Sequence, residues 1–555
     1  MTDTVRVHCL NTDLYKEVKI GSTLEELIDV LGVTSPYLIT NARVNNKTES
    51  LSYRLYRPKT IEFMDLSHTS AMRTYVRSLC FILAKAVNDT LPGAKTYIEH
   101  AVAKGYYFQI EADVPVGEPE LDVIRRRMQE TVDANLPFVQ VEEETEKVVQ
   151  LFRERGMEDK ARLLETSDFL YSRYSKLGEY INYFYGSLTP STGYITMFDI
   201  QPHNGGYLLR VPNRENPVEL EPEIQQEKLL NVYREHLKFL KISRLDNVGD
   251  LNCAKKKDQM SEVIQVAEAY QAKQIAEIAE EITARFKEGV RVVLISGPSS
   301  SGKTTFRKRL EIQLMVNLLK PVGISLDDYF VNRDDTPLDG NGGKDYESLY
   351  ALDLPLFEKD ILALMADERI ELPSYNFMTG RREFKQHYLK MEENSILIVE
   401  GIHGLNPELT AHIPPEKKFM VYVSALTTIS LDNHNWIPAS DNRLLRRIVR
   451  DYRYRGYSAQ DTISRWDSVR RGEDKWIFPY QENADVMFNS AMIYELAAIR
   501  RHAEPILQRV PRTVPEYSEA YRLLKFLGYF DYITDKELPP TSLLREFLGG
   551  SSFRY

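Results

Sequence analysis

Cysteine is scarce in this sequence, with 3 among 555 residues: Cys9, Cys80 and Cys253. Three widely spaced thiols can form neither a disulfide framework nor a cysteine-rich zinc site, which points to a reducing compartment. No segment approaches the roughly 20 consecutive apolar residues that a membrane-spanning helix needs. The first residues also lack the basic and then apolar pattern of a secretory leader. We therefore expect a cytoplasmic protein that does not contact a membrane.

Positive charge is in deficit as well, because 71 Lys and Arg residues face 81 Asp and Glu residues, a net charge of −10 with His neutral. Such a chain is a poor candidate for a general nucleic-acid coat, although a local basic patch is compatible with it. The three lysines at 255–257 are usually a solvated helix start, so contact with nucleic acid is the minority interpretation. RNA is thus not favoured as a partner by net charge, and the sequence leaves open whether chains associate.

The length suggests about three or four domains, and residues 1–66 form a small β-rich unit. Alternating apolar residues from Val5 to Leu10 predict a strand, and further strands are expected at 37–39 and 60–64. Residues 21–27 (G-S-T-L-E-E-L) and 41–47 (N-A-R-V-N-N-K) resemble the TGS domain, which implies a β-grasp fold. An unrelated small β-grasp-like domain is the alternative.

Residues 67–240 make a second, α+β unit, with a helix from Leu66 to Val87 and a strand at 105–110. It resembles the second additional domain of threonyl-tRNA synthetase, whose helix carries a His-x-x-x-His pair. Here His68 is followed by Met72, and His203 has no cysteine nearby. We therefore do not transfer the hydrolase activity and expect His68 to be a buried, hydrogen-bonded histidine. Residues 241–289 are predicted to be a helical connector.

The most informative motif follows a β-branched run at 290–296, typical of a buried parallel strand. Residues 297–304 read G-P-S-S-S-G-K-T, and a helical stretch follows from 306 to 318. In a G-x-x-x-x-G-K-T loop the N–H groups surround a phosphate, the lysine reaches the β and γ phosphates, and the threonine hydroxyl ligates Mg²⁺. A functionless Gly/Ser-rich loop would leave Lys303 and Thr304 unexplained. The sequence therefore predicts a nucleoside triphosphate site at Gly297, Pro298, Ser299, Ser300, Ser301, Gly302, Lys303, Thr304 and Thr305, with Thr304 at the metal.

Two further predicted strands end in acidic residues. Residues 322–326 lead into Asp327 and Asp328, and residues 395–399 lead into Glu400. Ligands of an open parallel sheet bind outside the carboxyl ends of its strands, so these acids should share a crevice with the phosphate loop. One can accept the proton of an attacking hydroxyl and another can hold the metal. Each acid alone could be a helix cap, Asp328 above all, but the three strand ends together favour an active site.

Residues 288–505 resemble the uridine kinase and phosphoribulokinase family of P-loop kinases in several segments that occur in the family's order. The segments are 325–330 (S-L-D-D-Y-F), 372–377 (L-P-S-Y-N-F), 398–402 (I-V-E-G-I), 441–451 (D-N-R-L-L-R-R-I-V-R-D) and 455–456 (R-G). The resemblance implies an α/β kinase domain at 290–505, with a parallel sheet flanked by helices. It also implies ATP and Mg²⁺ as cofactors, Asp327 as general base and Glu400 at the magnesium site.

The resemblance implies that residues 441–451 form an arginine-rich lid helix. Arg443, Arg447 and Arg450 have i, i+4, i+7 spacing, so they line one helix face that could close over a triphosphate. The alternative is a solvated face paired with Asp441 and Asp451. We expect Arg450 to clamp developing charge, together with Arg455 at the lid end.

The resemblance also implies that Tyr375 and Phe377 embrace a nucleoside, while Arg447 helps to position it. Glu347 loosely matches the family's sugar-reading aspartate. Two departures put pyrimidine recognition in doubt. Gly380 stands where the pyrimidine kinases have a base-contacting histidine, and Tyr457 stands where they have a second lid arginine.

The sequence thus predicts a kinase that transfers the γ-phosphate of ATP to a hydroxyl of a nucleoside-like acceptor. The phosphoryl group would be handled by Lys303, Asp327, Arg450 and Arg455. Two alternatives stay open: an ATP-switched protein that associates with tRNA, and a kinase of a sugar phosphate. Residues 506–555 are expected to add an amphipathic helix over 538–550 with a glycine stop, packed on the kinase core.

Overall fold

The structure is a computed structural model that describes residues 3–340 and 342–554. Its first unit is a five-stranded sheet in the order β2-β1-β5-β3-β4, with one helix packed against it. The strands β1 and β5 pair in parallel, and the other pairs are antiparallel. The elements are β1 (Thr4–Cys9), β2 (Leu14–Lys19), α1 (Leu24–Val30), β3 (Ile39–Val44), β4 (Lys47–Ser50) and β5 (Lys59–Asp65). The expected β-grasp arrangement is therefore present.

Local chemistry explains where α1 begins. Thr23 accepts a hydrogen bond from the Glu26 N–H at 3.3 Å, and the Glu26 carboxylate accepts one from the Thr23 N–H at 3.0 Å. This reciprocal capping box satisfies two donors that a helix start would otherwise leave free.

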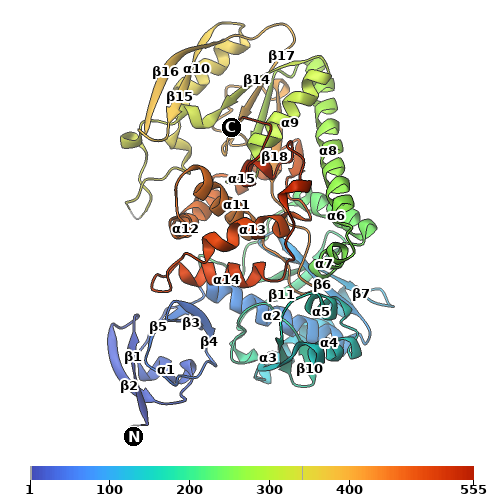
Figure 1. Cartoon of the computed structure of the whole chain (residues 1–555), viewed down its shortest axis with the longest axis vertical. Coiled ribbons are helices and arrows are strands. Elements are labelled where there is room, and N and C mark those ends of the chain that lie inside the picture. Colours follow the sequence, from blue (N-terminus) through green and yellow to red (C-terminus); the bar gives the residue numbers. More distant parts are fainter. Residues whose placement is uncertain (1–2, 341, 555) are drawn as a thin grey trace.

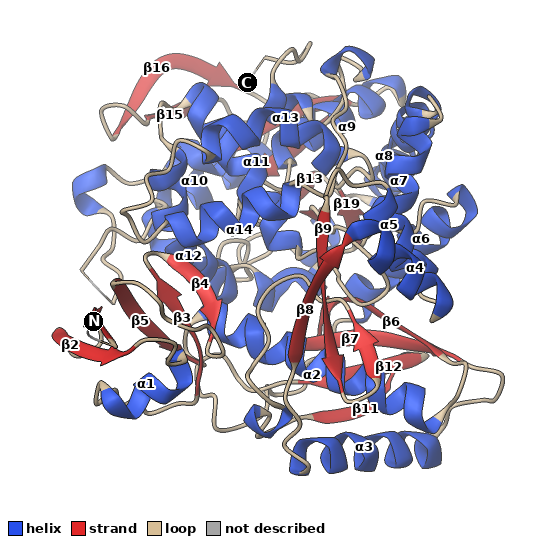
Figure 2. Ribbon diagram, turned by 60° about the horizontal axis from the view of Figure 1, so that its bottom comes forward, coloured by secondary structure: helices blue, strands red, loops and turns tan. Residues whose placement is uncertain are grey.

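The second unit is mixed α and β, as expected. Its long helix α2 (Thr69–Thr90) is almost wholly buried and is covered by the four-stranded sheet β11-β12-β7-β6 and by α3. A separate three-stranded sheet, β10-β9-β8, lies beside it (Figure 2). The further elements are β6 (Lys95–Val102), β7 (Gly105–Glu111), α3 (Glu118–Asp133), β8 (Val139–Glu144), α4 (Thr145–Glu154), α5 (Glu158–Glu165), β9 (Tyr171–Leu177), β10 (Tyr180–Asn182), β11 (Asp199–His203) and β12 (Gly206–Arg210).

Three helices lead from this unit to the kinase-like core: α6 (Glu227–Ser243), α7 (Val248–Lys256) and α8 (Met260–Glu288). The lysines at 255–257 lie at the end of α7, not at the start of a helix as the sequence suggested. Cations at a helix C-terminus are stabilised by the negative end of its dipole, which accounts for their place.

The core is a five-stranded, wholly parallel sheet in the order β14-β17-β13-β18-β19. Every residue of β13 (Val292–Ser296) and β17 (Ser395–Glu400) is buried, which is typical of strands covered on both faces. The remaining strands are β14 (Lys320–Ser325), β18 (Lys418–Ser424) and β19 (Val486–Asn489), and the hairpin β15 (Ile370–Asn376)–β16 (Arg381–Leu389) projects at one end of the molecule (Figure 1). The flanking helices are α9 (Lys303–Val316), α10 (Leu354–Met365), α11 (Ala439–Tyr454), α12 (Ala459–Trp476) and α13 (Glu495–Leu507).

The C-terminal segment packs on this core, but the expected helix over 538–550 is wrong in extent. After α14 (Tyr517–Leu527), the described residues contain the short 3-10 helix Asp535–Glu537 and one further α-helix, α15 (Arg545–Leu548). Pro539 and Pro540 lack the N–H donors that a longer helix would need. The helix ends at Gly549, whose φ is +84°, so the glycine stop is present. Within the described residues, no helix combines the length and apolarity that crossing a membrane requires.

Candidate active site

The phosphate loop joins the buried strand β13 to the N-terminus of α9, as the sequence predicted. Ser300 and Gly302 have positive φ angles of +59° and +85°. A Cβ atom on Gly297 would lie 1.9 Å from the carbonyl oxygen of Val423, so only glycine fits there. Because α9 begins at Lys303, the positive end of its dipole faces the loop. This strand–loop–helix arrangement suits an anion such as a phosphate.

Lys303 lies over the loop with its ammonium group in an acidic environment. Its Nζ donates to the carbonyl oxygens of Gly297 at 2.9 Å and of Pro298 at 3.1 Å. Burial lowers the pKa of Lys303, and four carboxylates oppose that shift. They belong to Glu400, Asp327, Glu546 and Glu347. The lysine is therefore the centre around which the acidic groups of the site converge.

Thr304 and Glu400 form the metal candidate. The Thr304 hydroxyl donates to Glu400 Oε1 at 3.1 Å, and Glu400 is the buried last residue of β17. Burial raises the pKa of Glu400, while Arg307 and Lys303 oppose the shift. No group of three or more His, Cys, Asp or Glu side chains in the described part of the chain could enclose a metal. Mg²⁺ usually takes one or two carboxylates and completes its shell with water and phosphate, so this oxygen pair fits it.

Asp327 follows β14, and the sheet register explains why it meets Glu400. Ser325 at the end of β14 stands opposite Glu400 at the end of β17, and the Asp327 carboxyl lies in electrostatic range of Glu400. Asp327 keeps solvent access, but the surrounding protein raises its pKa, against the influence of Lys303, Arg455 and Arg450. The structure thus brings the two strand-end acids together at one edge of the sheet.

Glu347 reaches the same crevice from the loop before α10. Burial raises its pKa to about 7, and Arg447 is the strongest opposing charge. Lys303 and Asp327 also lie in its electrostatic range. A Cβ atom on Gly472 of α12 would lie 2.3 Å from Glu347 Cβ, so the glycine permits this close approach.

The arginines of α11 divide into structural and site-facing groups. Arg443 is 2% exposed and pairs with the buried Glu473, while its Nη1 donates to the Ser299 carbonyl oxygen at 3.1 Å. Arg446 is also buried and pairs with Glu495 at 2.7 Å. Arg443 is therefore not part of an open lid face, contrary to the expectation from the i, i+4, i+7 spacing. Its place is explained by a carboxylate on α12 that neutralises it.

The site-facing group is Arg447, Arg450 and Arg455. All three lie within 3.4 Å of the buried Asp451, at 3.3, 3.2 and 3.4 Å respectively. Arg447 Nη1 also donates to the Ser299 hydroxyl at 2.9 Å. Arg450 is the main cause that lowers the pKa of Arg455 to about 10, followed by burial. One carboxylate for three guanidinium groups leaves positive charge facing Asp327.

An aromatic cluster lies beside the crevice on the β15 side. Tyr375 and Phe377 have ring centroids 5.1 Å apart, and the Phe330 ring is 5.5 Å from Tyr375. The Tyr375 N–H donates to Asp328 Oδ1 at 3.2 Å, which ties the hairpin to the neighbour of Asp327. Phe377 is 58% exposed, so the cluster offers an open apolar face.

Three residues of the site were not predicted: Glu473, His403 and Glu546. Glu473 accepts the Ser299 N–H at 3.1 Å, and Glu546 accepts the Thr305 N–H at 3.2 Å and its hydroxyl at 2.7 Å. The buried His403 ring faces the backbone of Glu347, and burial lowers its pKa to about 4. Of the three, only His403 could have been suspected from the sequence, because it comes three residues after Glu400. Glu473 and Glu546 are far from the phosphate loop along the chain.

Residues 292–496 match the model of the Phosphoribulokinase / Uridine kinase family. Over 195 residues the chain is 25% identical to a uridine kinase of Halobacterium salinarum, an alignment that covers 35% of this chain and 77% of that enzyme. A solved structure described as a possible uridine kinase from Bacillus stearothermophilus aligns with 39% of this chain and 98% of its own, at 20% identity and a TM-score of 0.28. Residues 292–496 are therefore similar to the P-loop kinases of this family.

The N-terminal region is similar to threonine–tRNA ligases. The chain is 27% identical over 186 residues to the ligase of Syntrophomonas wolfei subsp. wolfei, which covers 33% of this chain and 29% of the ligase. It thus spans less than a third of the length of that relative.

Proposed function

We propose that the protein transfers the γ-phosphate of ATP to a hydroxyl group of a small, nucleoside-like acceptor. The observation that carries the proposal is the convergence of Lys303, Asp327 and the pair Arg450 and Arg455 in one crevice. A phosphoryl-transfer site needs a cation for the phosphates, a base for the acceptor and positive charge at the transferring group.

Each group has a role that its surroundings support. Lys303 and the loop N–H groups hold the triphosphate, and Asp327 accepts the proton of the attacking hydroxyl. Arg450 and Arg455 stabilise the charge that develops on the transferring group. Thr304 and Glu400 would hold Mg²⁺, which would neutralise phosphate charge when bound.

The proposed acceptor follows from the aromatic rings and the charged side chains beside Asp327. The rings of Tyr375 and Phe377 offer faces on which a base can stack, while Arg447 and Glu347 supply a donor and an acceptor at the crevice. The φ of Gly380 is +69°, and a Cβ there would lie 2.6 Å from Arg333 Nε, so a bulkier residue is excluded at this position. We therefore propose a nucleoside acceptor without restricting it to pyrimidines.

The test is a panel of purine nucleosides, pyrimidine nucleosides and sugar phosphates, each with ATP and Mg²⁺. ADP release and the phosphorylated product are both scored, with Lys303→Ala as the inactive control. The proposal predicts product with at least one nucleoside. Product with sugar phosphates only would contradict the nucleoside acceptor, and ATP hydrolysis without any product would contradict the kinase assignment.

A further inference from the structure

Six cationic side chains gather where α14 meets the two N-terminal units, away from the phosphate loop. They come from β4, α2, β9 and α14, four elements that are far apart in the chain. The residues are Lys47, Arg73, Arg77, Arg173, Arg522 and Lys525. The helix α14 lies between the kinase core and the N-terminal units (Figure 1).

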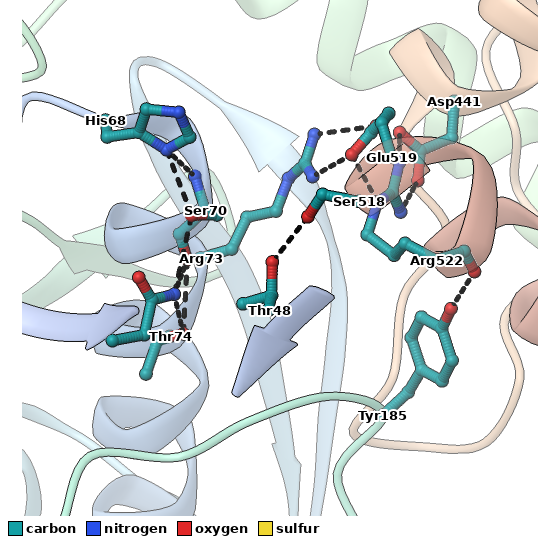
Figure 3. Close-up of polar contacts among 11 residues, drawn as sticks. Thr48, His68, Ser70, Arg73, Thr74, Tyr185, Asp441, Ser518, Glu519 and Arg522 are labelled. Atoms are coloured by element: carbon teal, nitrogen blue, oxygen red, sulfur yellow. Dashed lines mark hydrogen bonds and ion pairs between the residues drawn. The ribbon is translucent and has the colours of Figure 1, made fainter. Parts of the chain in front are cut away.

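Four of these cations have carboxylate partners. Arg73 pairs with Glu519 at 3.0 Å, and Arg522 pairs with Asp441 at 2.6 Å (Figure 3). Lys47 has Glu49 at 3.7 Å, and Arg173 has Glu142 at 3.1 Å. Neither Arg77 nor Lys525 has a carboxylate within 4.0 Å among residues 3–340 and 342–554. These two cations of the cluster thus form no ion pair within the described part of the chain.

Arg77 lies deep in the junction, against a turn shaped to receive it. Its Nη1 donates to the Ser187 carbonyl oxygen at 2.6 Å. The neighbouring Gly186 has a φ of +117°, and a Cβ there would lie 2.2 Å from Arg77 Nη1. Burial is the main cause that lowers the pKa of Arg77 to about 10, and the charge of Arg73 adds to it. The guanidinium group uses one donor on a backbone oxygen, and further N–H groups remain for a ligand.

Lys525, on α14, lies over the ring of Tyr185, the residue before the Gly186 turn that receives Arg77. Its Nζ is 5.6 Å from the centroid of the Tyr185 ring, and the side chain remains exposed. The surrounding protein lowers its pKa to about 8, and Arg173, Arg77 and Lys47 act in the same direction while Glu49 opposes them. The like charges of Arg77 and Lys525 thus oppose each other, and a bound anion would relieve the repulsion.

We infer that Arg77 and Lys525 form a binding site for the phosphate group of a small ligand. A phosphate monoester carries a charge of about −1.5 to −2 at neutral pH, which matches two uncompensated cations. The guanidinium group can bind two phosphate oxygens at once, and the ammonium group adds a point charge. The site is compact and the chain carries a net charge of −10, so a small phosphate ligand suits it better than a polynucleotide.

The site would join α2 of the second unit to α14, where the Arg73–Glu519 ion pair already links the two helices. Arg73 on α2 and Arg522 on α14 share Glu519, and Arg522 also binds Asp441 in the first turn of α11 (Figure 3). A phosphate held by Arg77 and Lys525 would add a second bridge between α2 and α14. This inference does not depend on the reaction catalysed at the phosphate loop.

The test uses the full chain with Lys303→Ala, which weakens phosphate binding at the loop. Calorimetric titrations with inorganic phosphate and with AMP are carried out on three proteins. They are the Lys303→Ala background, the same background with Arg77→Gln, and the same background with Lys525→Gln. Lys257→Gln is the matched control, because Lys257 is exposed. Lys525 is exposed, so its variant keeps the test valid if Arg77→Gln fails to fold.

The inference predicts a dissociation constant at least tenfold higher in Lys525→Gln than in the background, with no change in the control. Binding of AMP alone would mark a nucleotide as the source of the phosphate, and binding of both probes would mark the phosphate itself as sufficient. Less than a twofold change in Lys525→Gln would overturn the site. Filter retention of tRNA is measured on the same variants, and its loss in Lys525→Gln, with neither small probe bound, would overturn the small ligand in favour of RNA.

Discussion

Arg443 and Glu473 form a buried ion pair, and both side chains hydrogen-bond to the backbone of Ser299. Arg443 Nη2 lies 2.8 Å from Glu473 Oε2, Arg443 Nη1 donates to the Ser299 carbonyl oxygen, and Glu473 accepts the Ser299 N–H. The side chain of Arg443 is 2% exposed and that of Glu473 is wholly buried. The pair therefore connects α11 and α12 directly to the backbone of the phosphate loop.

Removal of Glu473 should destabilise the protein strongly. Glu473→Gln leaves the Arg443 charge buried without its partner, and breaking a buried pair costs about 3–5 kcal/mol. Chemical denaturation measures the loss in the free energy of unfolding. Glu416→Gln, at an exposed position, is the control. A loss below about 1 kcal/mol would show that the pair contributes little.

Glu546→Gln should tighten ATP binding. The carboxylate accepts the Thr305 N–H and lies in electrostatic range of Lys303, so its charge opposes a triphosphate in the loop. We expect the dissociation constant for ATP to fall severalfold, measured by calorimetry. Glu537→Gln, which is exposed, should leave it unchanged. Weaker ATP binding in Glu546→Gln would instead indicate that the carboxylate holds the loop in its binding shape.

Glu347 should make the stability of the ligand-free protein depend on pH. Its pKa is raised from 4.5 to about 7, chiefly by burial, so the folded state holds a proton that the unfolded state has lost. The stabilisation is fully present below about pH 4.5 and is lost as the pH rises through 7. Unfolding free energies of the wild type and Glu347→Gln should diverge over this range by at most about 3 kcal/mol. Parallel curves would contradict the raised pKa.

Short-range patterns accounted for much of the fold. The strand, glycine loop and helix at 290–316, and the acids that end β14 and β17, depend on residues close together in the sequence. The meeting of Ser325 with Glu400 then follows from parallel pairing of neighbouring strands. These features are predictable because local propensity and sheet geometry determine them together.

The remaining parts depend on contacts between distant segments. Arg443 had the spacing of a lid face, but its partner Glu473 is 30 residues away on the next helix. Glu546 and Thr305 are 241 residues apart in the sequence, so no local sequence pattern predicts their hydrogen bond. The helix predicted over 538–550 is wrong in extent, because Pro539 and Pro540 lack the N–H donors that its first turns would need. The packing of Arg77 against the turn at Gly186 also joins residues that are distant in the sequence, so residue spacing could not predict it.

In the proposed reaction Asp327 is the base for an acceptor hydroxyl beside a triphosphate held by Lys303. The most direct test of this role compares turnover and ATP affinity in Asp327→Asn, with Asp328→Asn as the neighbouring control, on the best acceptor of the panel. The account predicts that Asp327→Asn lowers kcat by about 10²–10⁴-fold while the dissociation constant for ATP changes less than threefold. Equal losses of turnover and ATP affinity, or full turnover in the variant, would contradict it.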